Sequence, residues 1–279
     1  MKVSGSDNLG PNLENDDLLF HYTRTSTALE KILHEGKIRL RLLTETNDPR
    51  EYKDKILGAF GWSLRPEDNQ QINAADKALR RILEKECRAM SFCANSKPTI
   101  VFNSGVRKED GTANTVGWNK PRMWSQYGED HHGICLAFSK NALKAEINTK
   151  KEIIKFFRDQ HVMYELPGRP SIKSSTIDAT RLRNEGVEVY CMNHIRDNAE
   201  ALFFTKDIDY RDENEYRFIL FDPDGKIEYI EIARSIKCLI QGDRTAGVYS
   251  PLIQELCIRY RIEQRKVLWD GGQAHLRSL

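Results

Sequence analysis

The chain has 279 residues, of which 39% are hydrophobic and 30% are charged. This length is sufficient for one large globular domain, and the apolar fraction excludes a disordered chain. The formal net charge of +2 excludes a protein that coats nucleic acid through bulk charge, although a local basic groove stays open. No apolar run reaches membrane-span length and the polar N-terminus has no signal-peptide core, so we expect a cytoplasmic protein without membrane contact.

The cysteines and histidines give no pattern typical of a metal site. The six cysteines are widely scattered without a Cys-x-x-Cys pair, which indicates buried free thiols in a reducing compartment. His131 and His132 are adjacent and therefore point apart, and no carboxylate or cysteine stands at ligand spacing, so we interpret them as loop residues. We expect no metal.

The first half of the chain predicts helices and strands in irregular order. We interpret residues 1–17, rich in Asn, Asp and Gly, as a flexible leader before a single domain over 18–279. Apolar runs and periodicity then predict the following: a strand over 18–23, a helix from 26 or 27 to Gly36, a strand over 38–43, a turn over 46–49, helices over 50–60 and 70–87, a strand over 88–94 and a long loop over 95–120.

In the second half, predicted strands cluster late. Pro121 opens a short helix, and 133–139 is a clear apolar strand. Residues 140–205 are predicted to be a mainly helical insertion. Three strands over 213–221, 226–232 and 236–242 follow, then a helix over 251–261 and a last short strand over 267–269. Because strands and helices do not alternate regularly, the predicted class is α+β.

Four polar-aromatic segments on or beside apolar strands are candidates for a site, since buried polar groups must find partners. In the first, His21 lies inside an apolar strand, where it is either a core residue bonded to a carbonyl or a ligand-binding residue. In the second, Trp124 and Tyr127 are three apart on a predicted helix face, which predicts either a core stripe or an aromatic wall for a planar ligand.

The third segment carries carboxylates. Glu213, Glu215 and Arg217 fall on one face of the predicted strand over 213–221 by its period of two. They are either a solvated edge with an ion pair or a catalytic carboxylate with its orienting partner. The fourth segment is the turn that begins at Asn47, which is weak evidence by itself.

Taken together, these segments resemble a bacterial family known as domain of unknown function 2971. The resemblance is carried by His-Tyr-Thr, Leu-x-x-Ile-Leu-x-x-Gly and Asn-Asp-Pro-x-Glu early in the chain, and by Met123-Trp124-x-x-Tyr127 later. Lys206 with Glu213-x-Glu215-Tyr216-Arg217 and a closing strand over 236–242 complete it. It covers about residues 18 to 245 and implies no activity.

A looser resemblance does imply one. A first-strand histidine followed by Leu-x-x-Ile-Leu-x-x-Gly is similar to the start of DNA-targeting ADP-ribosyltransferase toxins and tRNA 2′-phosphotransferases, and a late Glu-x-Glu at a strand head is similar to the third ADP-ribosyltransferase motif. The sequence lacks a clear Ser-Thr-Ser middle motif, which leaves the target residue class open. The implied fold is a split mixed β-sheet with helical insertions.

The resemblance implies NAD as substrate and a role for each candidate residue. Glu215 would stabilise the oxocarbenium-like state that forms when nicotinamide leaves, Glu213 would orient substrate or acceptor, and His21 would hydrogen-bond the ribose. The other predicted NAD contacts are Tyr22, Thr23, Asn47, Trp124, Tyr127 and Arg217, with Tyr127 and Trp124 stacking on nicotinamide and Arg217 pairing with a carboxylate or the pyrophosphate.

Three functions stay open at this stage. The first is an ADP-ribosyltransferase that modifies a nucleic-acid or protein target, as a toxin or phage-defence effector, with an antitoxin or immunity protein as a conceivable partner. The second is an NAD glycohydrolase, and the third is a non-catalytic binding module of the same fold. Several arginines, Arg39 and Arg41 among them, are either a basic face for a nucleic acid or part of a solvated mixed-charge surface.

Overall fold

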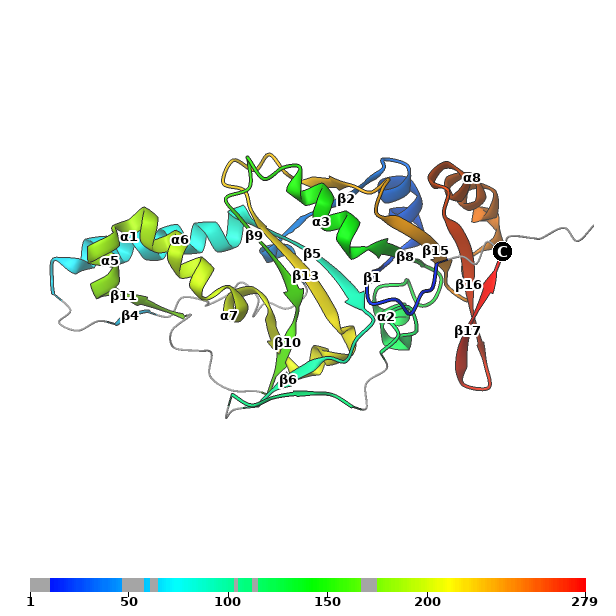
Figure 1. The fold of residues 1–279 in the computed structure, drawn as a ribbon, viewed down its shortest axis with the longest axis horizontal. Coiled ribbons are helices and arrows are strands. Elements are labelled where there is room, and N and C mark those ends of the chain that lie inside the picture. Colours follow the sequence, from blue (N-terminus) through cyan, green and yellow to red (C-terminus); the bar gives the residue numbers. More distant parts are fainter. Residues whose placement is uncertain (1–10, 47–57, 61–64, 103–104, 112–114, 167–174) are drawn as a thin grey trace, which may run out of the picture.

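A mixed sheet of nine strands forms the centre of the molecule (Figure 1). The structure, a computed structural model, describes residues 11–46, 58–60, 65–102, 105–111, 115–166 and 175–279. Eight strands follow in the order β17-β16-β15-β8-β1-β5-β13-β9, and β3 pairs with β5. The strands are β1 (Leu18–Thr23), β3 (Arg41–Leu42), β5 (Cys87–Ala94), β8 (Ile134–Ser139), β9 (Phe156–His161), β13 (Glu215–Phe221), β15 (Ile236–Gln241), β16 (Glu263–Asp270) and β17 (Gln273–Ser278).

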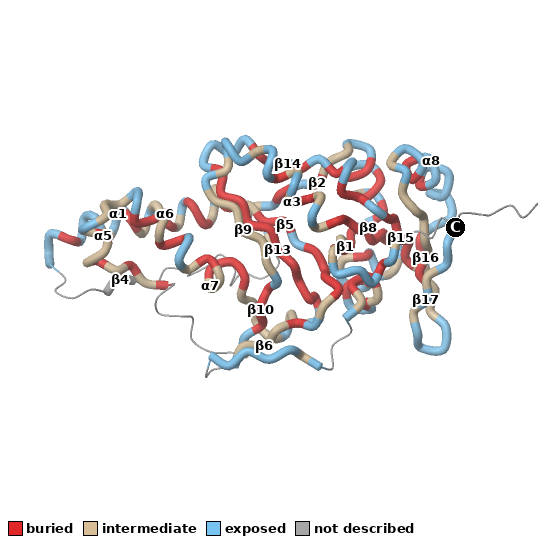
Figure 2. The backbone as a smooth tube through the Cα atoms, in the orientation of Figure 1, coloured by how far each residue is buried: buried red, intermediate tan, exposed pale blue. Residues whose placement is uncertain are grey.

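The middle strands are buried on both faces, as Figure 2 shows for β8, β1, β5 and β13. Every residue of β8 and of β13 is buried. A strand that is covered on both sides needs apolar side chains at successive positions, which explains why Ile-Cys-Leu-Ala-Phe and Phe-Ile-Leu-Phe read as continuous apolar runs. The strongest apolar runs of the sequence therefore lie at the centre of the sheet.

Helices cover both faces. One face packs on a π-helical turn, η1 (Thr27–Leu33), and on α3 (Lys140–Asn148) and α8 (Ser250–Tyr260). The other face packs on α2 (Pro121–Gln126) next to β1 and on a group of helices beside β13. This group extends away from the sheet in Figure 1 and comprises α1 (Asp68–Arg81), η4 (Ile82–Glu86), α5 (Ala179–Glu185), α6 (Val187–Asp197) and α7 (Ala199–Phe203).

Short strands form three further small sheets among the described residues. The first of these sheets contains β6 (Thr99–Val101), β7 (Arg107–Glu109), β10 (Met163–Glu165) and β12 (Thr205–Asp207). The second contains β4 (Gly58–Phe60) and β11 (Thr176–Asp178), and the third contains β2 (Lys37–Arg39) and β14 (Tyr229–Glu231). The sheet that contains β10 reaches the start of β13, where the backbone N–H of Val162 donates to the carbonyl of Glu215. The remaining short helices are η2 (Leu43–Glu45), η5 (Ile208–Glu213) and η6 (Gly247–Tyr249).

The central sheet splits between β1 and β5. β1 pairs with β8 along its whole length, but its registered partners in β5 are confined to Leu19 and Phe20. Further along β5, the edge opposite β13 is taken by β3, which pairs with residues 88 and 89. On this edge, residues 90–92 of β5 have no strand partner among the described residues, and β1 diverges from them. The divergence opens a gap inside an otherwise continuous sheet.

The mixed sheet with helices agrees with the predicted α+β class. The predicted mainly helical region over 140–205 contains α3, α5, α6 and α7, but it also includes the strands β9, β10 and β11 and the start of β12, which were not predicted. β9 reads Phe-Phe-Arg-Asp-Gln-His and is half-buried, as an edge strand covered on one side is. Its polar residues hide the alternation that would have predicted a strand.

Other predicted boundaries also change. The strand over 38–43 is two strands in two sheets, because the backbone of Leu40 between them bonds to Glu228. The loop over 95–120 contains the hairpin β6–β7, and residues 58–60 are a strand where a helix was predicted. The last strand is longer than predicted and is followed by β17, whose exposed polar residues gave no signal.

The predicted flexible leader over 1–17 is corrected for residues 11–17. Leu13 is buried, and the side-chain amide of Asn95 donates to the carbonyls of Leu13 and Asn15 at 2.8 and 2.9 Å. The hydroxyl of Ser139 donates to the carboxylate of Asp17 at 2.7 Å. These contacts hold the segment against β5 and β8.

Two sequence predictions concern the cysteines and membrane-spanning helices. All six cysteines are buried and free, as predicted. In the part of the chain that the structure describes, no helix combines the length and the apolar character needed to cross a bilayer.

Candidate functional site

A pocket of about 470 Å³ lies where β1 diverges from β5. Its walls come from segments far apart in the sequence: β1, β3, β5, the end of α2, β12 and the start of β13. Its size is typical of a small-molecule site. The described residues with polar or charged side chains that line it include His21, Thr23, Arg24, Thr27, Arg39, Arg41, Glu45, Thr46, Ser91, Gln126, Tyr127, Lys206, Glu213, Glu215 and Arg217.

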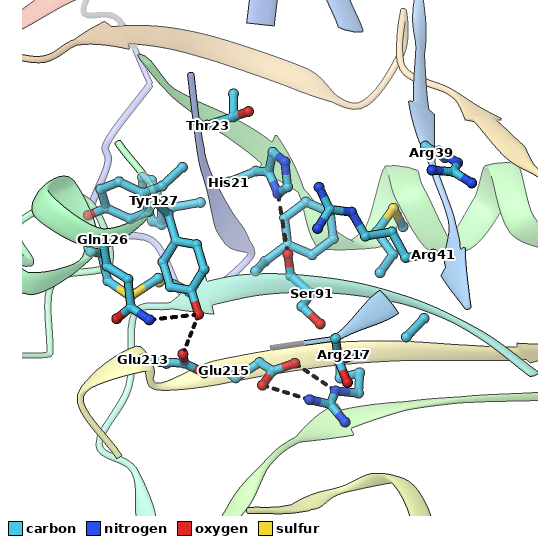
Figure 3. A pocket seen from close by; sticks show the side chains of 18 of the residues that line it. His21, Thr23, Arg39, Arg41, Ser91, Gln126, Tyr127, Glu213, Glu215 and Arg217 are labelled. Carbon is cyan, nitrogen blue, oxygen red and sulfur yellow. Dashed lines mark hydrogen bonds and ion pairs between the residues drawn. The ribbon is translucent and has the colours of Figure 1, made fainter. Parts of the chain in front are cut away.

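His21 reaches across the gap to β5. Its Nδ1 lies 3.4 Å from the carbonyl oxygen of Ser91, as Figure 3 shows. A carbonyl only accepts hydrogen bonds, so this contact assigns the proton to Nδ1. Burial, with a smaller contribution from the nearby charge of Arg41, outweighs the hydrogen bond to Ser91 and lowers the pKa of His21 to about 4. At neutral pH the imidazole is therefore uncharged and leaves Nε2 as an acceptor for a ligand hydroxyl.

His21 and Glu215 approach this pocket from opposite faces of the sheet. Phe20 is paired with Cys93 and Cys93 with Glu215, so these three side chains point to the same side. His21 follows Phe20 and points to the other side, where its ring packs edge-on against Phe92 at 5.7 Å between centroids. Both residues line one pocket because the pocket lies at the gap between the strands. A continuous sheet would have separated them.

Four charged side chains form what we call the carboxylate cluster: Lys206, Glu213, Glu215 and Arg217. Arg217 donates from Nε and Nη2 to the two carboxylate oxygens of Glu215 at 2.6 and 2.9 Å. The ammonium of Lys206 lies 2.8 Å from Oε2 of Glu213 and 2.8 Å from Oε2 of Glu215. The two positive and two negative charges compensate one another, so the cluster carries no net charge.

Burial makes the charge of Glu215 depend on its partners. Burial by itself raises the pKa of this carboxyl group, but the cations of Arg217 and Lys206 outweigh it and hold the pKa well below its ordinary value. The guanidinium of Arg217 is 2% exposed and also donates to the carbonyl of Phe203 at 2.8 Å. Glu215 is therefore a fixed, ionised carboxylate whose orientation is set before any ligand arrives.

Asn214 brings Glu213 to the pocket. It adopts a left-handed backbone conformation with φ of 44°, which Asn tolerates better than most residues, and it ends η5 just before β13 begins. Its side-chain amide donates to the carbonyl of Ala94 at 2.9 Å, and its own carbonyl accepts from the backbone N–H of Ala94. The predicted strand thus begins at Glu215 rather than 213, and Glu213 lines the pocket from the helical turn.

Tyr127 links α2 to the carboxylate cluster. Its hydroxyl donates to Oε1 of Glu213 at 2.8 Å (Figure 3). The chain after Tyr127 contains three successive residues in the left-handed region, Glu129, Asp130 and His131. Such backbone costs energy and persists only where the surroundings impose it. Here the carboxylate of Glu129 accepts from the backbone of Thr25 at 3.1 Å, which ties the segment to the end of β1.

Gly133 is needed for the same close approach. A Cβ atom added there would lie 2.4 Å from the carbonyl oxygen of Thr23 and 2.8 Å from the backbone of Gly128. Real contacts of this kind are excluded by steric repulsion, so a side chain at this position would push the segment that follows Tyr127 away from β1. The position of Tyr127 in the pocket wall thus depends on Gly133, which directly precedes β8.

Trp124 does not line the pocket, contrary to the prediction. It is 0% exposed, and its indole donates to the carbonyl of Trp118 at 2.9 Å. α2 ends at Gln126, so Tyr127 no longer shares a helix face with Trp124. Tyr22 lines the pocket beside His21, while its ring packs on Trp124 and its hydroxyl donates to the carbonyl of Gly117 at 2.7 Å.

The remaining predicted residues have mixed outcomes. Thr23 is buried and lines the pocket on the same strand as His21. Arg217 pairs with a carboxylate, one of the two roles predicted for it, and its two outward nitrogens are occupied by Glu215. Asn47 and the turn it begins lie outside the described residues. Within the described ranges, no group of three histidine, cysteine or acidic side chains is arranged to hold a metal ion.

The sequence interpretation missed three pocket residues: Lys206, Arg24 and Arg41. Nothing local signals that a lysine nine residues before Glu215 will bridge two carboxylates. The sequence around Arg24 and Arg41 is equally compatible with a solvated surface. Their position at the gap follows from the pairing of β3 with β5 and from the divergence of β1.

One family model matches the chain. The family described as "Protein of unknown function (DUF2971)" matches residues 123–218, about a third of the chain. This range runs from α2 into β13 and contains Tyr127, Lys206, Glu213, Glu215 and Arg217, but not His21. The match supports the first of the two resemblances. Comparison with curated proteins and comparison with solved structures each found no match.

Proposed function

We propose that this protein is an NAD-dependent ADP-ribosyltransferase that modifies a macromolecular target. One observation carries the proposal: His21 of the first strand, Tyr127 and the late Glu213 and Glu215 line one pocket at a split in the central sheet. These are the residues to which the ADP-ribosyltransferase resemblance assigns ribose binding, nicotinamide stacking and catalysis. The split sheet is also the fold that the resemblance implies.

The chemistry of each group suits cleavage of the nicotinamide–ribose bond. As nicotinamide leaves, positive charge builds on the ribose, and a preorganised carboxylate stabilises that state more than the ground state. Glu215 is ionised and fixed by Arg217, so no reorganisation is needed when the charge develops. The neutral Nε2 of His21 accepts a hydrogen bond from a ribose hydroxyl, and the ring of Tyr127, held by Glu213, forms the wall against nicotinamide.

The pairing of Glu215 with two cations leaves two alternatives to Glu215 as the catalytic carboxylate. Both oxygens of Glu215 already accept hydrogen bonds from cations, which weakens its field at a developing positive charge. Glu213 has a neutral partner in Tyr127 and shares Lys206, so Glu213 is the alternative catalytic carboxylate. If neither is catalytic, the pocket belongs to a binding module.

The first experiment measures nicotinamide release from NAD by the purified protein. We expect Glu215→Gln to lower the rate by about 10²-fold or more, the scale of a lost transition-state electrostatic group. The matched control is Glu255→Gln, a change at a carboxylate on α8 outside the pocket, which should keep the wild-type rate. If Glu213→Gln is the more damaging variant, the two carboxylates exchange roles.

The same assay distinguishes the rival functions. Rapid release without any acceptor indicates an NAD glycohydrolase, in which water takes the ADP-ribose. Release that requires added DNA, RNA or protein, with label transferred to it, indicates a transferase of the toxin or phage-defence type. No heat of NAD binding in calorimetry, together with unchanged behaviour of Glu215→Gln, would leave the binding module.

A further inference from the structure

The charges around the pocket are not balanced. Among the described lining residues, five carry positive and three carry negative side chains, which leaves an excess of two positive charges. The carboxylate cluster is neutral, as shown above, so the excess lies elsewhere. An excess of this sign inside a concave site attracts anions.

Most of the positive groups are already paired. Lys206 and Arg217 are bound in the carboxylate cluster. Arg39 donates to Glu228 at 3.1 Å and lies 3.2 Å from Glu45. This also accounts for the third lining carboxylate, since Glu45 is committed to Arg39.

Two guanidinium groups are left over, Arg24 and Arg41, which we call the arginine pair. Both side chains are exposed, both line the pocket, and neither has an ion pair or side-chain hydrogen bond with any residue that the structure describes. Arg24 directly follows β1, and Arg41 lies on β3, which flanks the open edge of β5. The two arginines therefore come from the two elements that border the gap.

Arg41 lies near His21 within the pocket. Figure 3 shows its side chain directed toward His21 and Ser91. The carboxylates of Glu213 and Glu215 are compensated by Lys206 and Arg217. An anion bound at the arginine pair would thus meet unpaired donors without facing an uncompensated carboxylate.

We propose that Arg24 and Arg41 form a phosphate-binding subsite at the mouth of the pocket. Arginine suits this role because its planar fork of N–H donors matches two phosphate oxygens at once. The phosphate comes either from the diphosphate of a dinucleotide or from the backbone of a nucleic-acid acceptor. The first source rests on the proposed function, in which NAD occupies the pocket, whereas the subsite itself does not.

The test uses inorganic pyrophosphate as the probe, measured by calorimetry on the full chain. Arg41→Gln and Arg24→Gln should each weaken pyrophosphate binding by about tenfold or more, and Arg41→Lys by less, because it keeps the charge but loses the fork. Arg234→Gln, at an exposed arginine outside the pocket, is the matched control and should bind like the wild type. Melting temperatures check that the exposed substitutions leave the fold intact.

Competition distinguishes the two sources and separates this proposal from the proposed function. Displacement of pyrophosphate by NAD assigns the subsite to the dinucleotide, and displacement by a short single-stranded oligonucleotide alone assigns it to the acceptor. If pyrophosphate binds through Arg24 and Arg41 but neither displaces it, the subsite stands without a dinucleotide or a nucleic acid as its ligand, and nicotinamide release tests the proposed function separately. If the wild type does not bind pyrophosphate, or if Arg24→Gln and Arg41→Gln bind it as tightly as the wild type, the subsite is overturned while the proposed function stands.

Discussion

The two sides of the pocket differ in the burial and in the pairing of their polar groups. The carboxylate cluster is buried, fully paired and electrically neutral, and its hydrogen bonds exist without a ligand. The side of His21 and the arginine pair is open, and its Nε2 and guanidinium donors have no partner in the described part of the chain. A buried charged group must be paired within the protein, whereas an exposed one is solvated by water that a ligand can replace.

From this difference we expect the carboxylate cluster to contribute to stability and the open side to contribute to ligand binding. Changes in the carboxylate cluster should disturb folding together with function, because each removed charge leaves another one buried without its partner. Changes on the open side should act on ligands and leave the fold nearly untouched. Three measurements test this contrast.

The largest effect is expected for Arg217→Met. It removes both donors of the bidentate contact and leaves the buried carboxylate of Glu215 with Lys206. The free energy of unfolding should fall by about 3–5 kcal/mol, the usual cost of removing one partner of a buried pair. Denaturant titration measures this loss.

The double variant Glu215→Leu with Arg217→Met is the control for that experiment. Replacing a buried ion pair by apolar side chains of similar size is often neutral for stability, so most of the loss should be recovered while nicotinamide release stays absent. A single Arg217→Met variant as stable as the wild type would contradict the buried, paired state of the cluster.

A smaller effect is expected for Tyr127→Phe, which deletes the hydroxyl that donates to Glu213. A double-mutant cycle with Glu213→Gln should give an interaction energy of about 1–2 kcal/mol in unfolding. Tyr249→Phe, at an exposed tyrosine outside the pocket, is the control and should be neutral. An interaction energy of zero would mean that Tyr127 is not part of the fixed side of the pocket.

The smallest effect is a dependence of stability on pH through His21. The ordinary pKa of 6.5 applies to the unfolded chain and about 4 to the native state, so in this window the unfolded state binds the proton first. Stability therefore falls as the pH is lowered through the window, and His21 accounts for about 1 kcal/mol between about pH 7.5 and about pH 5.5. His21→Asn should reduce the measured pH slope by that amount; an unchanged slope would show that the imidazole is solvated.

Several strands could be predicted from the sequence because their signal is local. β1, β5, β8 and β13 each contain a run with apolar residues on both faces, and such runs are recognisable wherever they pack. β9 and β17 could not be predicted in this way, because edge strands are half-exposed and carry polar side chains. Their existence depends on the neighbours with which they pair.

The candidate residues show the same limit. The alternation of Glu215, Tyr216 and Arg217 correctly predicted two faces, since Tyr216 packs in the core opposite the carboxylate. The spacing of Trp124 and Tyr127 misled, because α2 ends before Tyr127 and the two rings point to different surroundings. Periodicity predicts a shared face only as long as the element continues.

The sequence by itself determined which segments are buried strands and which residue types, an imidazole, a tyrosine and paired carboxylates, stand at their ends. Those features follow from side-chain polarity and from the regular repeat of the backbone, which act within a few residues. The tertiary structure alone decided that β1 and β5 diverge, that Lys206 joins Glu213 to Glu215, and that two arginines border the gap without partners. These depend on pairings between distant residues, such as Cys93 with Glu215 and Phe20 with Cys93, and no local repeat encodes them.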